Sequence, residues 1–80
     1  MGAFGKEAQS AITVQIKAEI AALDWRQSDL CNAIGIPTST LSRYLSGARD
    51  IPIPVFAEIA RALGLSIPEL LARAQRRRDG

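Results

Sequence analysis

Residues 27–47 read QSDLCNAIGIPTSTLSRYLSG, and this stretch decides the fold. It contains two short blocks of apolar residues at helical spacing, which predict two helices. Gly35 permits the left-handed backbone that ends a helix, and Pro37 disfavours helical geometry in the residue before it. We therefore predict a helix over residues 26–34, a tight turn and a second helix. The second helix starts at Pro37 or Thr38 and ends at Gly47.

The second of these helices has an apolar side and a polar side. The apolar side consists of Leu41, Tyr44 and Leu45. The polar side chains lie elsewhere on its surface: Thr38, Ser39, Ser42, Arg43 and Ser46. A helix that is anchored through one side and polar at its N-terminal end suits entry into the major groove of DNA, and two short helices across a tight turn are typical of a helix-turn-helix.

Helical patterns continue before this stretch. Apolar residues recur there at spacings of four, four and three, namely Ile12, Ile16, Ile20 and Leu23. This spacing predicts a helix over residues 10–23. Trp25 follows the break in the pattern.

Helical patterns also continue after it. A helix predicted over residues 54–63 buries Phe56, Ile59, Ala60 and Leu63, and Gly64 ends it. Ser66 and Glu69 then match a capping box, which predicts a fifth helix to about residue 76, buried through Leu70 and Leu71. No β-type alternation occurs. The predicted fold class is all-α, with five helices around one core.

The composition bounds the organisation of the chain. Its 80 residues suffice for one domain, and its hydrophobic content of 48% supports a packed core. We predict that residues 10–76 form the domain, that residues 1–9 form a flexible N-terminal arm, and that residues 77–80 form a basic tail.

The composition also argues against several functions. The chain has no histidine, which excludes metal sites built on imidazole, Ser-His-Asp triads and Cys-His pairs. No apolar run approaches the ~20 residues that span a membrane, and no secretory signal opens the chain. The single cysteine, Cys31, fits a reducing cytoplasm and is expected to be a core thiol. We predict a cytoplasmic protein that is not an enzyme and has no metal, cofactor, small-molecule substrate or membrane partner.

Positive charge gathers in the second half of the chain. Residues 1–40 hold three basic and four acidic side chains, whereas residues 41–80 hold seven arginines and four acidic side chains. Arginine is the side chain best shaped for phosphate. A solubilising surface with a basic helix end would give the same distribution, so charge alone does not identify a partner.

Residues 27–47 resemble the phage repressor/Cro family of helix-turn-helix domains. The family pattern places Gln, Leu, Ala, Leu and Gly at these spacings, followed by a Ser/Thr-rich segment, Ile or Leu, Ser, Arg, an aromatic residue or Ile, and a closing Gly. The resemblance extends with its spacing preserved through Arg49-Asp50, residues 59–66 and residues 69–71. It covers residues 13–71 and implies a repressor-like fold. It also implies a core position for Trp25, with base stacking as the less favoured alternative.

Three positions depart from the family pattern. Arg26 and Pro37 stand where the family has helix-capping Ser or Thr, and Cys31 replaces Ala. Asp24 could cap the second helix in place of Arg26, and Pro37 could serve as a first-turn residue of the third helix.

The resemblance implies a set of DNA-contacting residues. Those expected to contact bases are Thr38, Ser39, Ser42 and Arg43. Those expected to contact phosphate are Arg26, Gln27, Thr40 and Arg49. Arg43 is the strongest candidate for a base contact, because arginine pairs bidentately with guanine. Arg49 could instead pair with Asp50. Arg73 and residues 76–78 are expected to complement the end of the last helix, and contact with DNA is the less favoured alternative for them.

The resemblance implies a phage or bacterial transcriptional regulator that binds double-stranded DNA and is nucleoid-associated. We expect a repressor that acts as a homodimer on a two-fold-related operator, because one unit would bury only ~600–1,000 Å² on DNA. Two other classes stay open: an antitoxin or DNA-binding component of a two-protein module, and a helical protein-interaction module. Thr38, Ser39 and Arg43 argue against the last class, since a protein-docking face is normally apolar.

Overall fold

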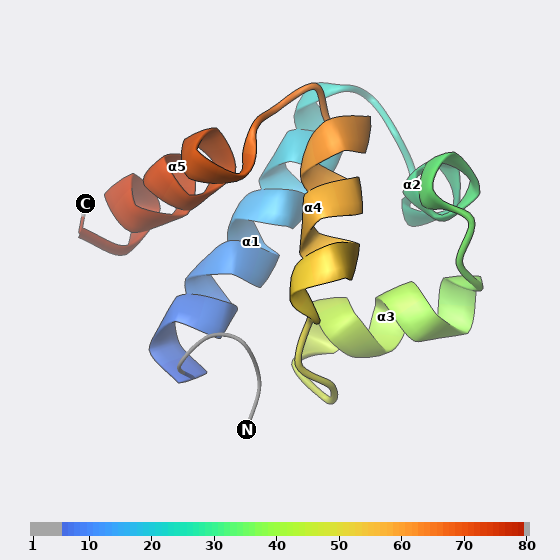
Figure 1. The fold of residues 1–80 in the computed structure, drawn as a ribbon, viewed down its shortest axis with the longest axis horizontal. Helices are drawn as coiled ribbons and strands as arrows, with labels where there is room; N and C mark the ends of the chain where they lie inside the picture. The colour runs from blue at the N-terminus through green and yellow to red at the C-terminus, as the bar shows by residue number, and fades with distance from the viewer. Residues whose placement is uncertain (1–5, 80) are drawn as a thin grey trace.

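The computed structural model describes the backbone of residues 6–79 and the side chains of residues 7–77. The described residues form five α-helices and no strand, which confirms the predicted all-α class (Figure 1). The helices are α1 (Lys6–Ala22), α2 (Gln27–Ile34), α3 (Thr38–Ser46), α4 (Ile53–Ala62) and α5 (Ile67–Asp79). None of them is long and apolar enough to cross a bilayer.

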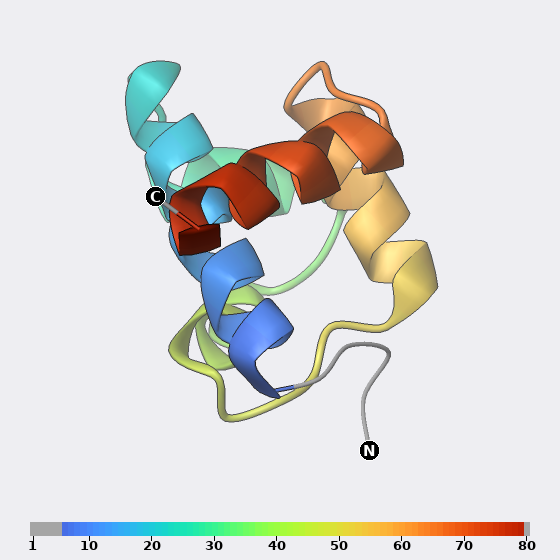
Figure 2. The same ribbon diagram turned by 90° about the vertical axis from the view of Figure 1, so that its left-hand side faces the viewer.

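The helices are arranged around α1 and α4. Helices α2 and α3 lie on one side of this pair and α5 lies on the other (Figures 1 and 2). Helix α1 contacts both α5 and α3, and α2 contacts α3 and α4. The predicted helix-turn-helix, α2 and α3, therefore forms one side of the five-helix domain.

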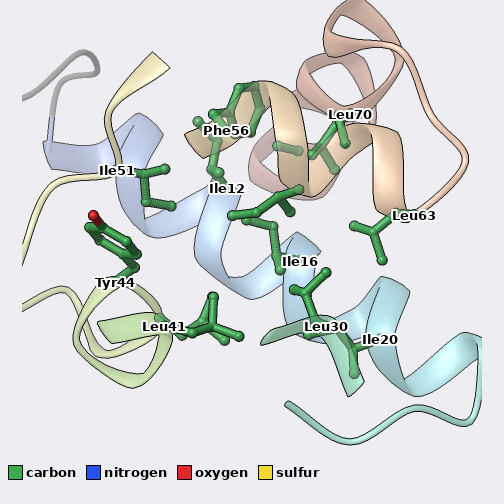
Figure 3. Close-up of a cluster of buried hydrophobic side chains, with 14 of the residues drawn as sticks. Ile12, Ile16, Ile20, Leu30, Leu41, Tyr44, Ile51, Phe56, Leu63 and Leu70 are labelled. Carbon is green, nitrogen blue, oxygen red and sulfur yellow. The ribbon is translucent and has the colours of Figure 1, made fainter. Parts of the chain in front are cut away.

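One hydrophobic core joins all five helices. Ile12, Ile16 and Ile20 are buried along α1, with side chains from the other four helices around them (Figure 3). Cys31 is buried in this core, as expected. Leu23 was expected on the same stripe, but it lies past the end of α1 and is 45% exposed.

Trp25 also differs from the expectation. Its side chain is half-buried and packs against the edge of the core. The short segment between α1 and α2 places the indole at the boundary with solvent.

The ends of α1 and α5 extend beyond the predicted domain. Helix α1 begins at Lys6, so residues 6–9 of the predicted arm are helical, and residues 1–5 lie outside the described residues. Helix α5 continues to Asp79, so the predicted tail is helical as far as the structure describes it. Both extensions consist mainly of good helix formers such as Ala, Gln, Glu, Lys and Arg.

Helix α4 begins and ends one residue before the predicted positions. Pro52 is its N-cap, with φ −65° and ψ 150°. Pro54 follows in the first turn, where its missing N–H group costs no intrahelical hydrogen bond. Leu63 is the C-cap, and Gly64 follows with φ 77°.

A polar cluster fixes α5 against α1. Nη1 of Arg73 donates to both carboxylate oxygens of Glu19, at 2.8 Å each. Nε2 of Gln15 donates to the same carboxylate at 2.7 Å, and Nε of Arg77 donates to Oε1 of Gln15 at 2.8 Å. Arg73 and Arg77 therefore do more than complement a helix end, because both side chains reach across to α1.

The pKa of Glu19 reflects this cluster. Burial tends to raise it, but hydrogen bonds from Arg73 and Gln15 and the charges of Arg73 and Arg77 hold the pKa of Glu19 below its usual value. A lowered pKa means that the ionised carboxylate stabilises the folded state.

We expect Glu19→Gln to lower the free energy of unfolding by about 1 kcal/mol at pH 7, because it removes a charged acceptor from a half-buried pair. This stabilisation is present above the unfolded-state pKa of glutamate, about 4.3, and is lost as pH falls through the lower folded-state pKa of Glu19. Urea unfolding at pH 7 and pH 3 measures it. Glu58→Gln is the matched control, because Glu58 pairs with Arg61 at the exposed surface. Equal losses in both variants at pH 7, or a Glu19→Gln loss that is as large at pH 3 as at pH 7, would contradict the prediction.

Candidate nucleic-acid interface

Helix α3 presents a polar face to solvent and an apolar face to the core. Its buried side chains are Leu41, Tyr44 and Leu45, which are at most 4% exposed. Its exposed side chains include all four residues that the sequence predicted to contact bases: Thr38, Ser39, Ser42 and Arg43. Positions separated by three or four residues share a helix face, so these four gather on the side opposite the anchor.

The start of α3 has no side chain that caps it. Pro37 is the N-cap, with φ −63° and ψ 147°, rather than a first-turn residue of the helix. The N–H groups of Thr40 and Leu41 bond to the carbonyl of Pro37 at 3.1 and 3.2 Å. The two earlier N–H groups of the helix have no intrahelical partner, so they can donate to an anion. The Thr40 side chain is half-buried, which suits support of the turn as well as a phosphate contact.

Asp29 bonds back to the residue at the start of α2. The N–H of Arg26, the N-cap, donates to Oδ2 of Asp29 at 2.7 Å. Asp24 does not cap α2; it lies in the turn after α1, with φ 59°. Gln27 is the first residue of α2, and both it and Arg26 are exposed.

The turn between α2 and α3 has the predicted geometry. Gly35 has φ 75° and its N–H donates to the carbonyl of Cys31 at 2.8 Å. Only glycine adopts this backbone without strain, so Gly35 fixes the path from one helix to the next. Gly47 ends α3 in the same conformation, with φ 84°.

Arg49 is tied to the end of α3. Its guanidinium carbon lies 5.4 Å from the centroid of the Tyr44 ring, which is a cation–π contact. Its N–H donates to the carbonyl of Arg43 at 3.2 Å. Within the described part of the chain Arg49 forms no ion pair with Asp50, so the alternative of a simple loop pair is not realised. The exposed Arg49 side chain therefore stays beside the C-terminal end of α3.

A shallow cavity of about 160 Å³ lies beside the start of α2. Lys17 of α1, Trp25 and Gln27 are among its lining residues. Lys17 is exposed and adds a positive group next to Gln27. Lys17 was not predictable as part of this surface, because only the packing of α1 beside the start of α2 brings it there.

The charges within residues 24–50, which carry the predicted DNA contacts, are balanced. Residues 24–50 contain three arginines, Arg26, Arg43 and Arg49, and three aspartates, Asp24, Asp29 and Asp50. The net charge of this segment therefore does not attract an anion strongly. An anionic partner would be held by the placement of individual arginines and free N–H groups.

Comparisons with known proteins agree with this geometry. A family model described as "Helix-turn-helix" matches residues 16–70. The crystal structure of the clp gene regulator ClgR from C. glutamicum aligns with a TM-score of 0.78 and 20% sequence identity, over 88% of this chain and 91% of that chain. No curated protein sequence matches the chain. The structural likeness shows a shared fold, and the family model covers more than half of the chain.

The matched region runs from α1 into α5 and contains α2, the Gly35 turn and α3. The chain therefore belongs to the phage repressor/Cro-type helix-turn-helix family of DNA-binding domains.

Proposed function

We propose that the protein is a transcriptional repressor that reads a specific sequence of double-stranded DNA with α3. The observation that carries this proposal is the division of α3 into a buried side and an exposed polar face that holds Thr38, Ser39, Ser42 and Arg43. Hydroxyl and guanidinium groups are donors and acceptors that discriminate bases in the major groove. In this proposal α3 lies in the groove with its N-terminal turn leading.

The groups that flank α3 suit the DNA backbone. Arg26 and Gln27 stand at the start of α2, where helix N–H groups attract an anion. Arg49 stands at the other end, tied to Tyr44. We infer that these flanking groups, with Thr40, contact phosphates and fix the orientation of α3, while α3 supplies the base contacts.

A dimer suits the modest charge of this surface. One domain carries only three arginines in residues 24–50, balanced by three aspartates, so a single unit has little sequence-independent affinity. Two copies on a two-fold-related operator would double both the phosphate contacts and the base contacts. The structural neighbour is named as a gene regulator, which supports a regulatory role for this chain.

The salt dependence of binding tests the phosphate contacts. We expect the logarithm of the association constant to fall linearly with the logarithm of salt concentration, with a slope of about −0.9 for each phosphate neutralised. Arg49→Ala should make the slope shallower by about 0.9 per bound protomer. Fluorescence anisotropy of a labelled duplex at several salt concentrations measures both slopes.

The matched control is Arg61→Ala. Arg61 is an exposed arginine of α4 that pairs with Glu58, and its loss should leave the slope unchanged. Equal slopes for the parent and Arg49→Ala would remove Arg49 from the interface. Absence of binding even at low salt would contradict the proposed function as a whole.

A further inference from the structure

A second basic surface lies between α1 and α5. It is an open groove of about 610 Å³ lined by Gln15, Glu19, Arg73, Arg76 and Arg77. Helix α5 lies on the side of the molecule away from α2 (Figures 1 and 2). A duplex that contacts α2 and α3 therefore leaves this groove open.

The arginines of the groove share one face of α5. Positions 73, 76 and 77 are separated by three and four residues, so their side chains are neighbours on the helix surface. Glu19 is the one acidic residue among those lining the groove, and Arg73 already bonds to both of its oxygens. The groove thus holds three guanidinium groups against one carboxylate.

The contacts hold two of these arginines in place. Arg73 is fixed by Glu19, and Arg77 is fixed through Nε by the neutral amide of Gln15. Gln15 itself is 8% exposed and bonds to Glu19, so the cluster is anchored in α1. Arginines in a last turn also stabilise the end of a helix, but that role does not require contacts to a neighbouring helix.

Arg76 has a different environment. Its side chain is exposed, lines the groove and makes no hydrogen bond or ion pair with the described residues. An arginine without a partner beside two arginines held in place leaves N–H donors of the open groove free to bind an oxyanion. Guanidinium groups match phosphate oxygens through paired N–H donors.

We propose that this groove is a second anion site, which binds phosphate groups independently of α3. After Glu19 offsets one arginine, two positive charges remain, which suit a ligand with at least two negative charges. Such phosphates occur in free phosphate compounds and in a nucleic-acid backbone. The proposal does not depend on the function proposed for α3, because the two surfaces lie on opposite sides of the fold.

Inorganic pyrophosphate is the probe, titrated into the whole chain by calorimetry and by amide NMR at constant ionic strength. We expect saturable binding, with shifts that centre on Gln15, Arg76 and Arg77. Arg76→Gln and the double variant with Arg77→Gln should weaken binding at least tenfold. Arg76→Gln removes no contact within the described residues, so it should fold like the parent. Arg61→Gln is the control and should bind like the parent, because Arg61 lies outside the groove.

A second titration, with a duplex of scrambled sequence, identifies the source of the phosphate. If the double variant weakens pyrophosphate binding but not duplex binding, the ligand is a free phosphate compound. If it weakens both, and pyrophosphate competes with the duplex, the ligand is a nucleic-acid backbone. Binding that does not saturate, or that falls equally in Arg61→Gln, would overturn the proposal.

Discussion

Phe56→Ala is expected to lower the free energy of unfolding by about 3–5 kcal/mol, which a domain of this size can scarcely tolerate. The Phe56 side chain is fully buried, and it lies with Ile12 and Leu70 in the core that joins α1, α4 and α5 (Figure 3). Truncation removes a large apolar surface and leaves a cavity that the packed helices cannot close. Circular dichroism during heating and urea titration should show a variant that is largely unfolded or melts far below the parent.

Trp25→Ala is the comparison for this effect. Trp25 is half-buried at the edge of the core, so its truncation should cost clearly less than that of Phe56 despite the larger side chain. Melting of Phe56→Ala within a few degrees of the parent would contradict the packing of α4. A larger loss in Trp25→Ala than in Phe56→Ala would contradict the same account.

Arg43→Ala is expected to weaken binding to the best DNA site by about 1–3 kcal/mol and to relax the base preference at one position of each half-site. Arg43 lies on the exposed face of α3 with Ser39 and Ser42, and its guanidinium can pair bidentately with a guanine. Loss of such a pair affects one base position and leaves the others intact. Anisotropy titrations with the best site and with a scrambled duplex measure the change.

Arg49→Ala supplies the contrast. Arg49 lies beyond Gly47 and stacks on Tyr44, so we expect it to contact only phosphate. Its loss should weaken specific and scrambled duplexes by similar factors. If Arg43→Ala also weakens both duplexes equally, Arg43 contacts the backbone, and the base contacts must come from Thr38, Ser39 and Ser42.

Local patterns made much of the fold predictable. The spacing of Ile12, Ile16 and Ile20 identified the buried side of α1, and all three are buried. The capping box was confirmed as well: the N–H of Ser66 donates to Oε1 of Glu69 at 3.1 Å, and the N–H of Glu69 donates to Oγ of Ser66 at 3.2 Å. Such features depend on residues three or four apart, so sequence spacing determines them directly.

Features that depend on tertiary packing were not predictable. Glu19 and Arg73 are separated by 54 positions, and nothing in either segment indicates the pair. Lys17 reaches the start of α2 only through the packing of α1 beside it.

The hydrogen bond from the Arg26 N–H to Asp29 was predictable in principle. Asp29 stands at the third helical position of α2, where an acidic side chain commonly bonds back to the N-cap.

The candidate interface divides in the same way. Helical periodicity was enough to place Thr38, Ser39, Ser42 and Arg43 on one exposed face, because their partners on the other face are plainly apolar. The stacking of Arg49 on Tyr44 was not visible in the sequence, because it depends on how the loop after α3 folds back. The position of Arg49 beside α3 therefore follows from the structure of the loop and not from its sequence.

Selection of bound duplexes from a random DNA pool tests the central claim, that α3 reads DNA sequence, most directly. We expect enrichment of one motif that consists of two inverted half-sites, with centres about one helical turn or a multiple of it apart. In the same selection, Arg43→Ala should lose the preference at one symmetric pair of positions. A parent protein that enriches no sequence, or an Arg43→Ala variant that enriches the unchanged motif with the same preference at every position, would contradict it.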